Sequence, residues 1–267
     1  MQTKTEMISK NQIKYIRQLE QKKFREREKC FVAEGPKVVG DLMRQYQPKA
    51  IFATEEWNGI GFMGPVPVSR VTDEELRRIS FLQAPQQVLA LFPIPEHTSY
   101  LSPLTIPEQS SPTHSLSHLY LALDSVQDPG NLGTIIRIAD WFGIDTIYCS
   151  EDTADAYNPK VVQATMGSLA HVHIIYCDLL KLFDTLPNDF PIYGTLLDGN
   201  DIYSQPLAQE GIIVMGNEGN GISEAVRQHV THRLLIPNFH QGESAESLNV
   251  AIATAITCSE FRRRGTK

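Results

Sequence analysis

One arginine, Arg137, lies in a stretch where a buried strand, a turn and a helix follow one another. Leu119 to Leu123 is a short apolar run, typical of a strand that is covered on both faces in a parallel sheet. Asp128-Pro129-Gly130 favours a turn, and we expect Asn131 to cap a helix that Gly143 ends. This order of elements places a permanently charged guanidinium on a helix that follows a sheet strand.

Two interpretations of Arg137 follow from this stretch alone. Gly133 lies one turn before it and has no side chain, which leaves open space beside the guanidinium for a ligand to dock. Alternatively, Arg137 is an ordinary surface cation that pairs with Asp140 one turn on or stacks on Trp141. Both remain open at this point.

A second stretch combines a strand with a glycine-rich loop. The apolar run Ile212 to Met215 leads into Gly216-Asn217-Glu218-Gly219-Asn220-Gly221. Glycines between a strand and a helix allow a ligand to approach the backbone closely. Their spacing, G-x-x-G-x-G after a late strand, disfavours a dinucleotide fold, whose G-x-G-x-x-G follows an early strand. The alternative is a tight turn around Asn220-Gly221.

A third stretch opens the last helix. Leu234 to Pro237 precedes a connection of residues 238–246, after which Ser247 is expected to cap a helix with Asn249 in its first turn. That helix is apolar on nearly every face, so we expect burial on both sides. It is either a core helix or a helix that packs against a second subunit.

These stretches need elements that position them. Residues 1–92 alternate strands and helices and predict a small α/β domain, which begins with a basic helix from Ile8 to Glu28. Residues 93–118 are rich in Pro, Ser and Thr and predict a linker. From residue 119 to 267 strands and helices alternate, which predicts a parallel sheet with helices on both faces.

Charge is distributed unevenly along the chain. The net charge is −7, yet residues 1–44 hold 11 Lys and Arg against 6 Asp and Glu, and residues 262–267 add four cations and no acid. Basic ends on an acidic protein suit a partner that is a polyanion. Solvated basic helices are the alternative interpretation of any single charge run.

Other features exclude several classes of protein. No apolar run approaches the roughly 20 residues that span a bilayer, and the start lacks a signal peptide's apolar core, so a cytoplasmic protein without a membrane partner is expected. The histidines and the four cysteines are scattered, so we expect buried, reduced thiols and no metal site.

The three stretches, in this order, resemble the three signature motifs of the SpoU (TrmH) family of SPOUT RNA methyltransferases. Residues 128–137 resemble motif one, Gly216 to Gly221 resembles motif two, and Ile236-Pro237 with Ser247 to Val250 resembles motif three. In the first domain, residues 9–25, 31–35 and 84–90 are similar to that family's ribosomal-protein-like substrate-binding domain.

The resemblance implies a 2'-O-methyltransferase that uses S-adenosylmethionine on a ribose of RNA. It implies a homodimer with a carboxy-terminal trefoil knot, and it favours ribosomal RNA, with guanosine by family analogy. Alternatives are a tRNA 2'-O-methyltransferase or a non-catalytic RNA-binding or ribosome-assembly factor. The implied catalytic residues are Arg137, Asn131 and Glu218, and the implied cofactor-binding residues are Leu196, Gly216, Ile236, Ser247, Leu248 and Asn249.

The charge of Arg137 limits its role, and the chain departs from the family pattern at two places. A guanidinium rarely loses its proton, so we expect Arg137 to act as an electrostatic clamp, with Glu218 or water taking the hydroxyl proton. The connection 238–246 is longer than usual, which affects the expected cofactor contacts. Gln86-Gln87 stands where a Gln-Gly pair is more usual.

Overall fold

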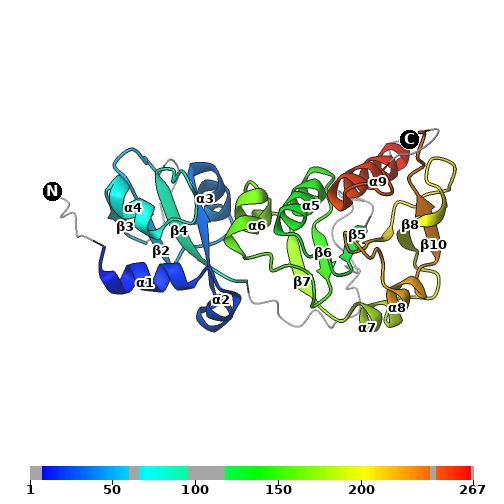
Figure 1. Cartoon of the computed structure of the whole chain (residues 1–267), viewed down its shortest axis with the longest axis horizontal. Coiled ribbons are helices and arrows are strands. Elements are labelled where there is room, and N and C mark those ends of the chain that lie inside the picture. Colours follow the sequence, from blue (N-terminus) through cyan, green and yellow to red (C-terminus); the bar gives the residue numbers. More distant parts are fainter. Residues whose placement is uncertain (1–7, 60–65, 96–117, 241–244, 266–267) are drawn as a thin grey trace, which may run out of the picture. The chain divides into compact units, whose positions relative to one another are not determined.

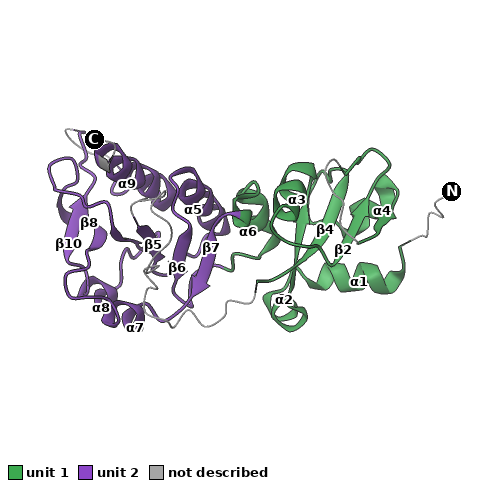
Figure 2. Ribbon diagram, turned by 180° about the vertical axis from the view of Figure 1, so that it is seen from behind, with its two compact units in different colours: residues 1–96, 155–170 green, residues 97–154, 171–267 purple. Residues whose placement is uncertain are grey.

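The chain folds into two compact units (Figures 1 and 2). The computed structural model describes residues 8–59, 66–95, 118–240 and 245–265. Unit 1 comprises residues 1–96 and 155–170, and unit 2 comprises residues 97–154 and 171–267. Most of the predicted linker, residues 96–117, lies outside the described residues.

Unit 1 contains a four-stranded mixed sheet in the order β1-β4-β2-β3. Strand β4 runs antiparallel to both β1 and β2, whereas β3 is parallel to β2. The strands are β1 (Cys30–Glu34), β2 (Ala50–Ala53), β3 (Val68–Arg70) and β4 (Val88–Pro93). The helices of its amino-terminal part are α1 (Lys10–Gln18), α2 (Lys22–Glu28), α3 (Pro36–Met43) and α4 (Asp73–Ile79).

The single basic helix predicted from Ile8 to Glu28 is wrong, because the chain breaks between α1 and α2. The physical reason is Arg25, which is 1% exposed. Its Nη1 donates to the carbonyls of Leu19 at 2.6 Å and Glu20 at 2.7 Å. Those carbonyls lie just past the end of α1, where backbone acceptors lack helical partners, and the guanidinium satisfies them.

Residues 155–170 also belong to unit 1, although in sequence they connect two strands of unit 2 (Figure 2). They form α6 (Pro159–Ala164) and a short 3-10 helix (Ser168–Ala170). Asp155 forms an ion pair with Arg25, and the Tyr157 ring lies 5.1 Å from the Phe31 ring. A buried cation needs such a partner, so this segment completes the core of unit 1.

Unit 2 is built on a six-stranded sheet in the order β10-β8-β9-β5-β6-β7, and every strand pair is parallel. Helices α5 and α9 lie on one side of it, and α7 and α8 lie on the other (Figure 1). The predicted parallel α/β fold class is confirmed. The strands are β5 (Leu119–Leu123), β6 (Thr146–Cys149), β7 (His173–Tyr176), β8 (Ile192–Asp201), β9 (Gly211–Met215) and β10 (His232–Leu235). The helices are α5 (Pro129–Trp141), α7 (Leu179–Asp184), α8 (Glu224–Arg227) and α9 (Val250–Gly265).

Several smaller expectations can be compared with the structure. All four cysteines are free thiols, and three of them, Cys30, Cys149 and Cys258, are buried, as predicted. None of the helices in the described residues is long and apolar enough to cross a membrane. The trefoil knot stays a prediction, because residues 241–244 of the connection into α9 lie outside the described part of the chain.

Candidate active site

The site begins where β5 leads into α5. The helix starts at Pro129, and Asp128 is its N-cap, with the carboxylate accepting from Asn131 N at 2.8 Å. The prediction that Asn131 caps this helix is therefore wrong. Proline favours the first helical position, which makes the residue before it the cap. The Asn131 side chain is thus left for contacts outside the helix.

The glycine-rich loop after β9 is a tight turn. Asn217 and Gly221 exchange two backbone hydrogen bonds, of 2.9 and 3.0 Å. A Cβ atom on Gly216 would lie 2.2 Å from the Gly221 carbonyl carbon, so no side chain fits there. Gly221 has a positive φ of 69°, which glycine adopts without strain.

Asp124 and Ser125, which the sequence analysis did not single out, join the turn after β5 to this loop. Asp124 accepts from Ser223 N at 2.7 Å, and the Asn217 side chain donates to Ser125 O at 2.7 Å. Asp124 is only 6% exposed. The sequence did contain a signal for these two residues. Asp124-Ser125 directly follows a buried strand, and the carboxyl ends of strands in parallel sheets often carry functional side chains.

Glu218 joins the same two segments. Its carboxylate accepts from Asp128 N and the Asn131 amide at 3.0 Å each and from Gln127 N at 3.2 Å. Partial burial acts to raise the pKa of Glu218, but these hydrogen bonds outweigh it and lower the pKa below its ordinary value. The carboxylate is therefore held in its charged form.

Asn249 connects α9 to the same cluster. Its carbonyl oxygen accepts from Ala251 N at 3.0 Å and Ile252 N at 3.3 Å, so Asn249 caps the last helix, and the prediction that Ser247 caps it is wrong. Its amide nitrogen donates to the Asn131 oxygen at 2.9 Å. The three predicted residues Asn131, Glu218 and Asn249 thus form one chain of hydrogen bonds.

A cavity of about 830 Å³ opens beside this cluster. Six of the predicted site residues line it: Leu196, Gly216, Glu218, Ile236, Ser247 and Leu248. Asn249, Asn131 and Arg137 do not line it. Leu197 and Phe239, which the sequence analysis missed, contribute apolar walls although they are 73% and 81% exposed.

Arg137 lies on α5, six residues after Asn131, which is about 9 Å along a helix. Its side chain is exposed, and among the described residues it has no ion pair, hydrogen bond or stacked ring. The alternative pairing with Asp140 does not occur, since Asp140 lies 3.2 Å from His171 instead. The guanidinium is therefore available to an external anion.

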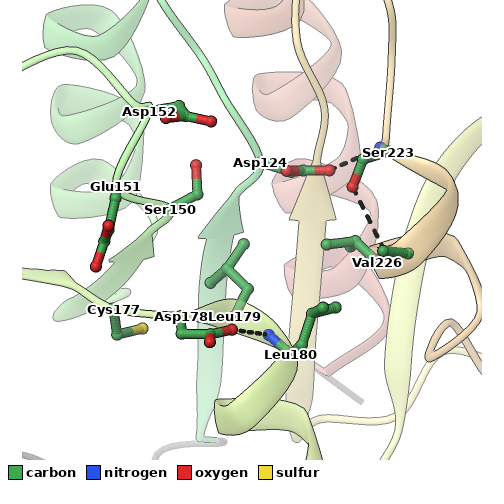
Figure 3. A pocket seen from close by; sticks show the side chains of 11 residues that line it. Asp124, Ser150, Glu151, Asp152, Cys177, Asp178, Leu179, Leu180, Ser223 and Val226 are labelled. Carbon is green, nitrogen blue, oxygen red and sulfur yellow. Dashed lines mark hydrogen bonds between the residues drawn. The ribbon is translucent and has the colours of Figure 1, made fainter.

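A second cavity of about 300 Å³ lies at the ends of β5, β6 and β7 (Figure 3). Two of its four carboxylates have structural roles, because Asp124 accepts from Ser223 N and Asp178 caps α7 by accepting from Leu180 N. None of the predicted site residues lines it, and its acidic walls repel a polyanion. In the described residues no group of three metal-ligating side chains occurs.

The larger cavity fits a cofactor such as S-adenosylmethionine. Its volume lies within the range of roughly 300–1,000 Å³ that is typical of small-molecule sites. Its walls combine apolar side chains with a glycine loop that admits close approach to the backbone. Glu218 and Glu246 supply negative charge that suits a cationic ligand.

The fold and the site together define a parallel-sheet methyltransferase with a cavity beside a glycine loop. The family description "SpoU rRNA Methylase family" matches residues 118–259, and "MRM3-like substrate binding domain" matches residues 10–90. Since the first match spans more than half of the chain, this protein belongs to the SpoU rRNA Methylase family. The resemblance seen in the three motifs is confirmed.

Individual relatives agree with this assignment. The chain is 29% identical over 259 residues to the 23S rRNA (guanosine(2553)-2'-O)-methyltransferase RlmP of Bacillus subtilis, covering 95% of this chain and 97% of that one. It is 32% identical over 149 residues to the 23S rRNA (guanosine-2'-O-)-methyltransferase RlmB of Neisseria meningitidis, covering 55% of this chain and 58% of that relative.

Solved structures extend the comparison to the fold. A Porphyromonas gingivalis protein assigned to the TrmH family of RNA methyltransferases superimposes with a TM-score of 0.79 at 40% identity, covering 97% of this chain and 100% of that one. An AdoMet-bound rRNA methyltransferase from Sinorhizobium meliloti superimposes with a TM-score of 0.78 at 29% identity, covering 96% and 95% of the two chains.

Proposed function

We propose that this protein transfers a methyl group from S-adenosylmethionine to a ribose 2'-hydroxyl of ribosomal RNA, with guanosine as the methylated nucleoside. The observation that carries the proposal is the position of Glu218. This residue lines the cavity and also binds Asn131 on α5, the helix that presents the unpaired Arg137. A cofactor site and an anion site are thereby built on adjoining segments.

S-adenosylmethionine would be held by Leu196, Gly216, Ile236 and the Ser247-Leu248 segment. The bound cofactor supplies a methyl group on a positively charged sulfur, which a hydroxyl oxygen can attack. The chain's own contribution is to hold cofactor and ribose in line, because alignment of two reactants supplies a large part of the rate. The glycine loop suits that role, because the Gly216 backbone packs so closely against Gly221 that no side chain fits between them.

Arg137 is proposed to bind a phosphate or the developing alkoxide of the attacked ribose. A guanidinium stays protonated at physiological pH, so it stabilises negative charge and does not remove a proton. Its exposure and its lack of a partner among the described residues support this role. Glu218 or a water molecule is left as the proton acceptor.

Unit 1 is proposed to bind the RNA. Helices α1 and α2 expose Lys10, Lys14, Lys22 and Lys23, and Lys10 and Lys14 have no ion pair among the residues that the structure describes. Lysines that are free of acidic partners can neutralise phosphates and release counterions. The match to a substrate-binding domain over residues 10–90 supports the same assignment.

The protein is further proposed to act in the cytoplasm as a homodimer through α5 and α9. On α9, Ile252 is 51% exposed, and Ala255 and Ile256 lie half-buried on the same face. On α5, Trp141 is 84% exposed. Apolar side chains exposed on two adjoining helices are typical of a surface that a second subunit covers.

The experiment is transfer of labelled methyl groups from S-adenosylmethionine to undermethylated ribosomal RNA, followed by digestion to nucleosides. We expect 2'-O-methylguanosine with the wild-type protein. For Arg137→Ala we expect turnover to fall by roughly 10²–10³-fold, as for the loss of one preorganised donor. Cofactor affinity measured by calorimetry should change by less than about threefold, because Arg137 does not line the cavity.

Lys181→Ala is the control, since Lys181 is an exposed cation on α7 that pairs with Asp178 and lies outside both the site and unit 1. Unchanged turnover in Arg137→Ala would contradict the clamp. Methylation of transfer RNA alone would favour the tRNA enzyme. Cofactor binding with no transfer to either RNA would favour the non-catalytic ribosome-assembly factor.

A further inference from the structure

The hydrogen bonds among Glu218, Asn131 and Asn249 have a fixed direction. At one end a carboxylate can only accept, so Asn131 must turn its amide nitrogen towards Glu218. At the other end the backbone N–H groups of Ala251 and Ile252 can only donate, so Asn249 must turn its oxygen towards them. Its amide nitrogen then faces the Asn131 oxygen at 2.9 Å. Neither amide can flip without losing bonds at both of its ends.

Glu218 has little capacity left to accept a hydrogen bond from a substrate hydroxyl. Gln127 N, Asp128 N and the Asn131 amide occupy three acceptor positions, and the Asn217 amide approaches the fourth at 3.5 Å. An ionised carboxylate offers about four such positions. A ribose hydroxyl would therefore have to displace a donor before it could give its proton to this group.

We infer that Glu218 and Asn249 are positioning residues that fix the orientation of the Asn131 amide, and that Glu218 is not the proton acceptor of the reaction. This inference rests on the proposed methyl transfer. Asn131 keeps one N–H and one lone pair for the ribose, pointing in directions set by its two neighbours. Because Glu218 lines the cofactor cavity and Asn131 lies in the first turn of α5, the network sets the ribose contact relative to the cofactor.

The inference is tested by a double-mutant cycle of Glu218→Gln and Asn131→Ala, read as kcat at saturating cofactor. If Glu218 acts through Asn131, each single variant loses about tenfold or more, and the double variant is within about threefold of the slower single variant. Multiplying losses would overturn the inference, because independent roles give additive effects on the activation free energy.

The pH dependence of Glu218→Gln provides a second readout. A positioning role predicts that kcat falls by a constant factor between about pH 6.5 and 9, parallel to the wild-type profile. If Glu218 were the proton acceptor, hydroxide would replace it in the variant, and the loss would shrink steadily as the pH rises. That second result would overturn the inference.

Asn249→Asp keeps the test decisive if Glu218→Gln does not fold. An aspartate still caps α9 with its carboxylate, yet it cannot donate to Asn131. We expect a loss of about tenfold or more in kcat for this variant, which should still unfold cooperatively. Wild-type kcat in Asn249→Asp would contradict the inference.

Glu224→Gln is the charge control, because Glu224 is an exposed carboxylate on α8 outside the network. Its kcat should stay within about twofold of wild type. A wild-type protein that transfers no methyl group would refute the proposed function. The inferred positioning role fails separately, if the wild-type enzyme is active and the activation free energies lost in Glu218→Gln and Asn131→Ala add up in the double variant.

Discussion

Gln87 adopts a left-handed backbone conformation, with a φ of 46°. It stands where the family pattern more often has glycine, and the structure supplies the reason for that preference. A left-handed conformation costs a non-glycine residue roughly 1–2 kcal/mol. The Gln87 carbonyl accepts from Thr54 N at 2.8 Å, so this geometry is held in place by the neighbouring strand end.

Gln87→Gly is therefore expected to stabilise unit 1. Relief of the backbone strain exceeds the added entropy of the unfolded chain, and we expect a net gain of about 0.5–1 kcal/mol. The measurement is the urea midpoint of unfolding. Gln87→Ala is the control and should show no gain, because alanine keeps the strain. A lower midpoint for the glycine variant would contradict the assignment.

Local rules could have placed one of the two helix caps of the site correctly, but not the other. Asp128 and Asn131 are both good caps, and Pro129 decides between them because proline prefers the first helical position. Ser247 and Asn249 are likewise both good caps, but no proline separates them. There the choice depends on Asn131, whose side chain holds Asn249 in place.

At the scale of elements, α9 answers a question that the sequence left open. It is neither fully buried nor amphipathic in the ordinary sense. Thr254, Thr257 and Cys258 are fully buried against the unit, whereas Ile252, Ala255 and Ile256 form a partly exposed apolar face. This arrangement favours a helix that is covered on one side by its own unit and on the other by a second subunit.

Ile252→Glu is expected to dissociate the proposed homodimer. The side chain is 51% exposed within one chain, so a glutamate is tolerated there, whereas burial of its charge in an apolar interface is costly. Sedimentation equilibrium should give twice the chain mass for wild type and the chain mass for the variant. Ser259→Glu, two turns further along the same face, should also weaken the dimer. A wild-type monomer would refute the dimer.

For the whole molecule, the question is how to test whether the basic unit 1 binds RNA. Removing residues 1–92 is a poor test of RNA binding, because residues 155–170 belong to unit 1 and would lose Arg25 and Phe31 as partners. Neutralising exposed lysines leaves that core intact.

Lys10→Gln combined with Lys14→Gln is expected to weaken RNA binding and its salt dependence. The slope of log K against log salt should decrease in magnitude by roughly 0.7–0.9 for each phosphate that the variant no longer neutralises. The measurement is filter binding or fluorescence titration at several salt concentrations with a ribosomal RNA that the enzyme methylates. Lys181→Gln is the control, since Lys181 is 79% exposed but pairs with Asp178. An unchanged slope would show that α1 does not contact the RNA.

The amino-acid sequence was sufficient to predict the order and type of most elements, and it contains the three motifs and the uneven charge. Apolar runs, turn residues and glycine spacing are local, and local patterns predict strands, turns and helices well. The side chains that meet at the site were identified by the resemblance to the family's three motifs. Local patterns did not predict the burial of Arg25, because its partner Asp155 lies 130 residues away.

The hydrogen bonds among those side chains depend on contacts between distant parts of the chain. Asn131 bonds to Glu218 and Asn249, which lie 87 and 118 residues away in sequence, so no local pattern could have indicated the direction of that network. The direction follows from groups at its two ends, a carboxylate that only accepts and backbone amides that only donate. The carboxylate follows β9 and the backbone amides open α9, so the network exists only once the parallel sheet has brought these segments together.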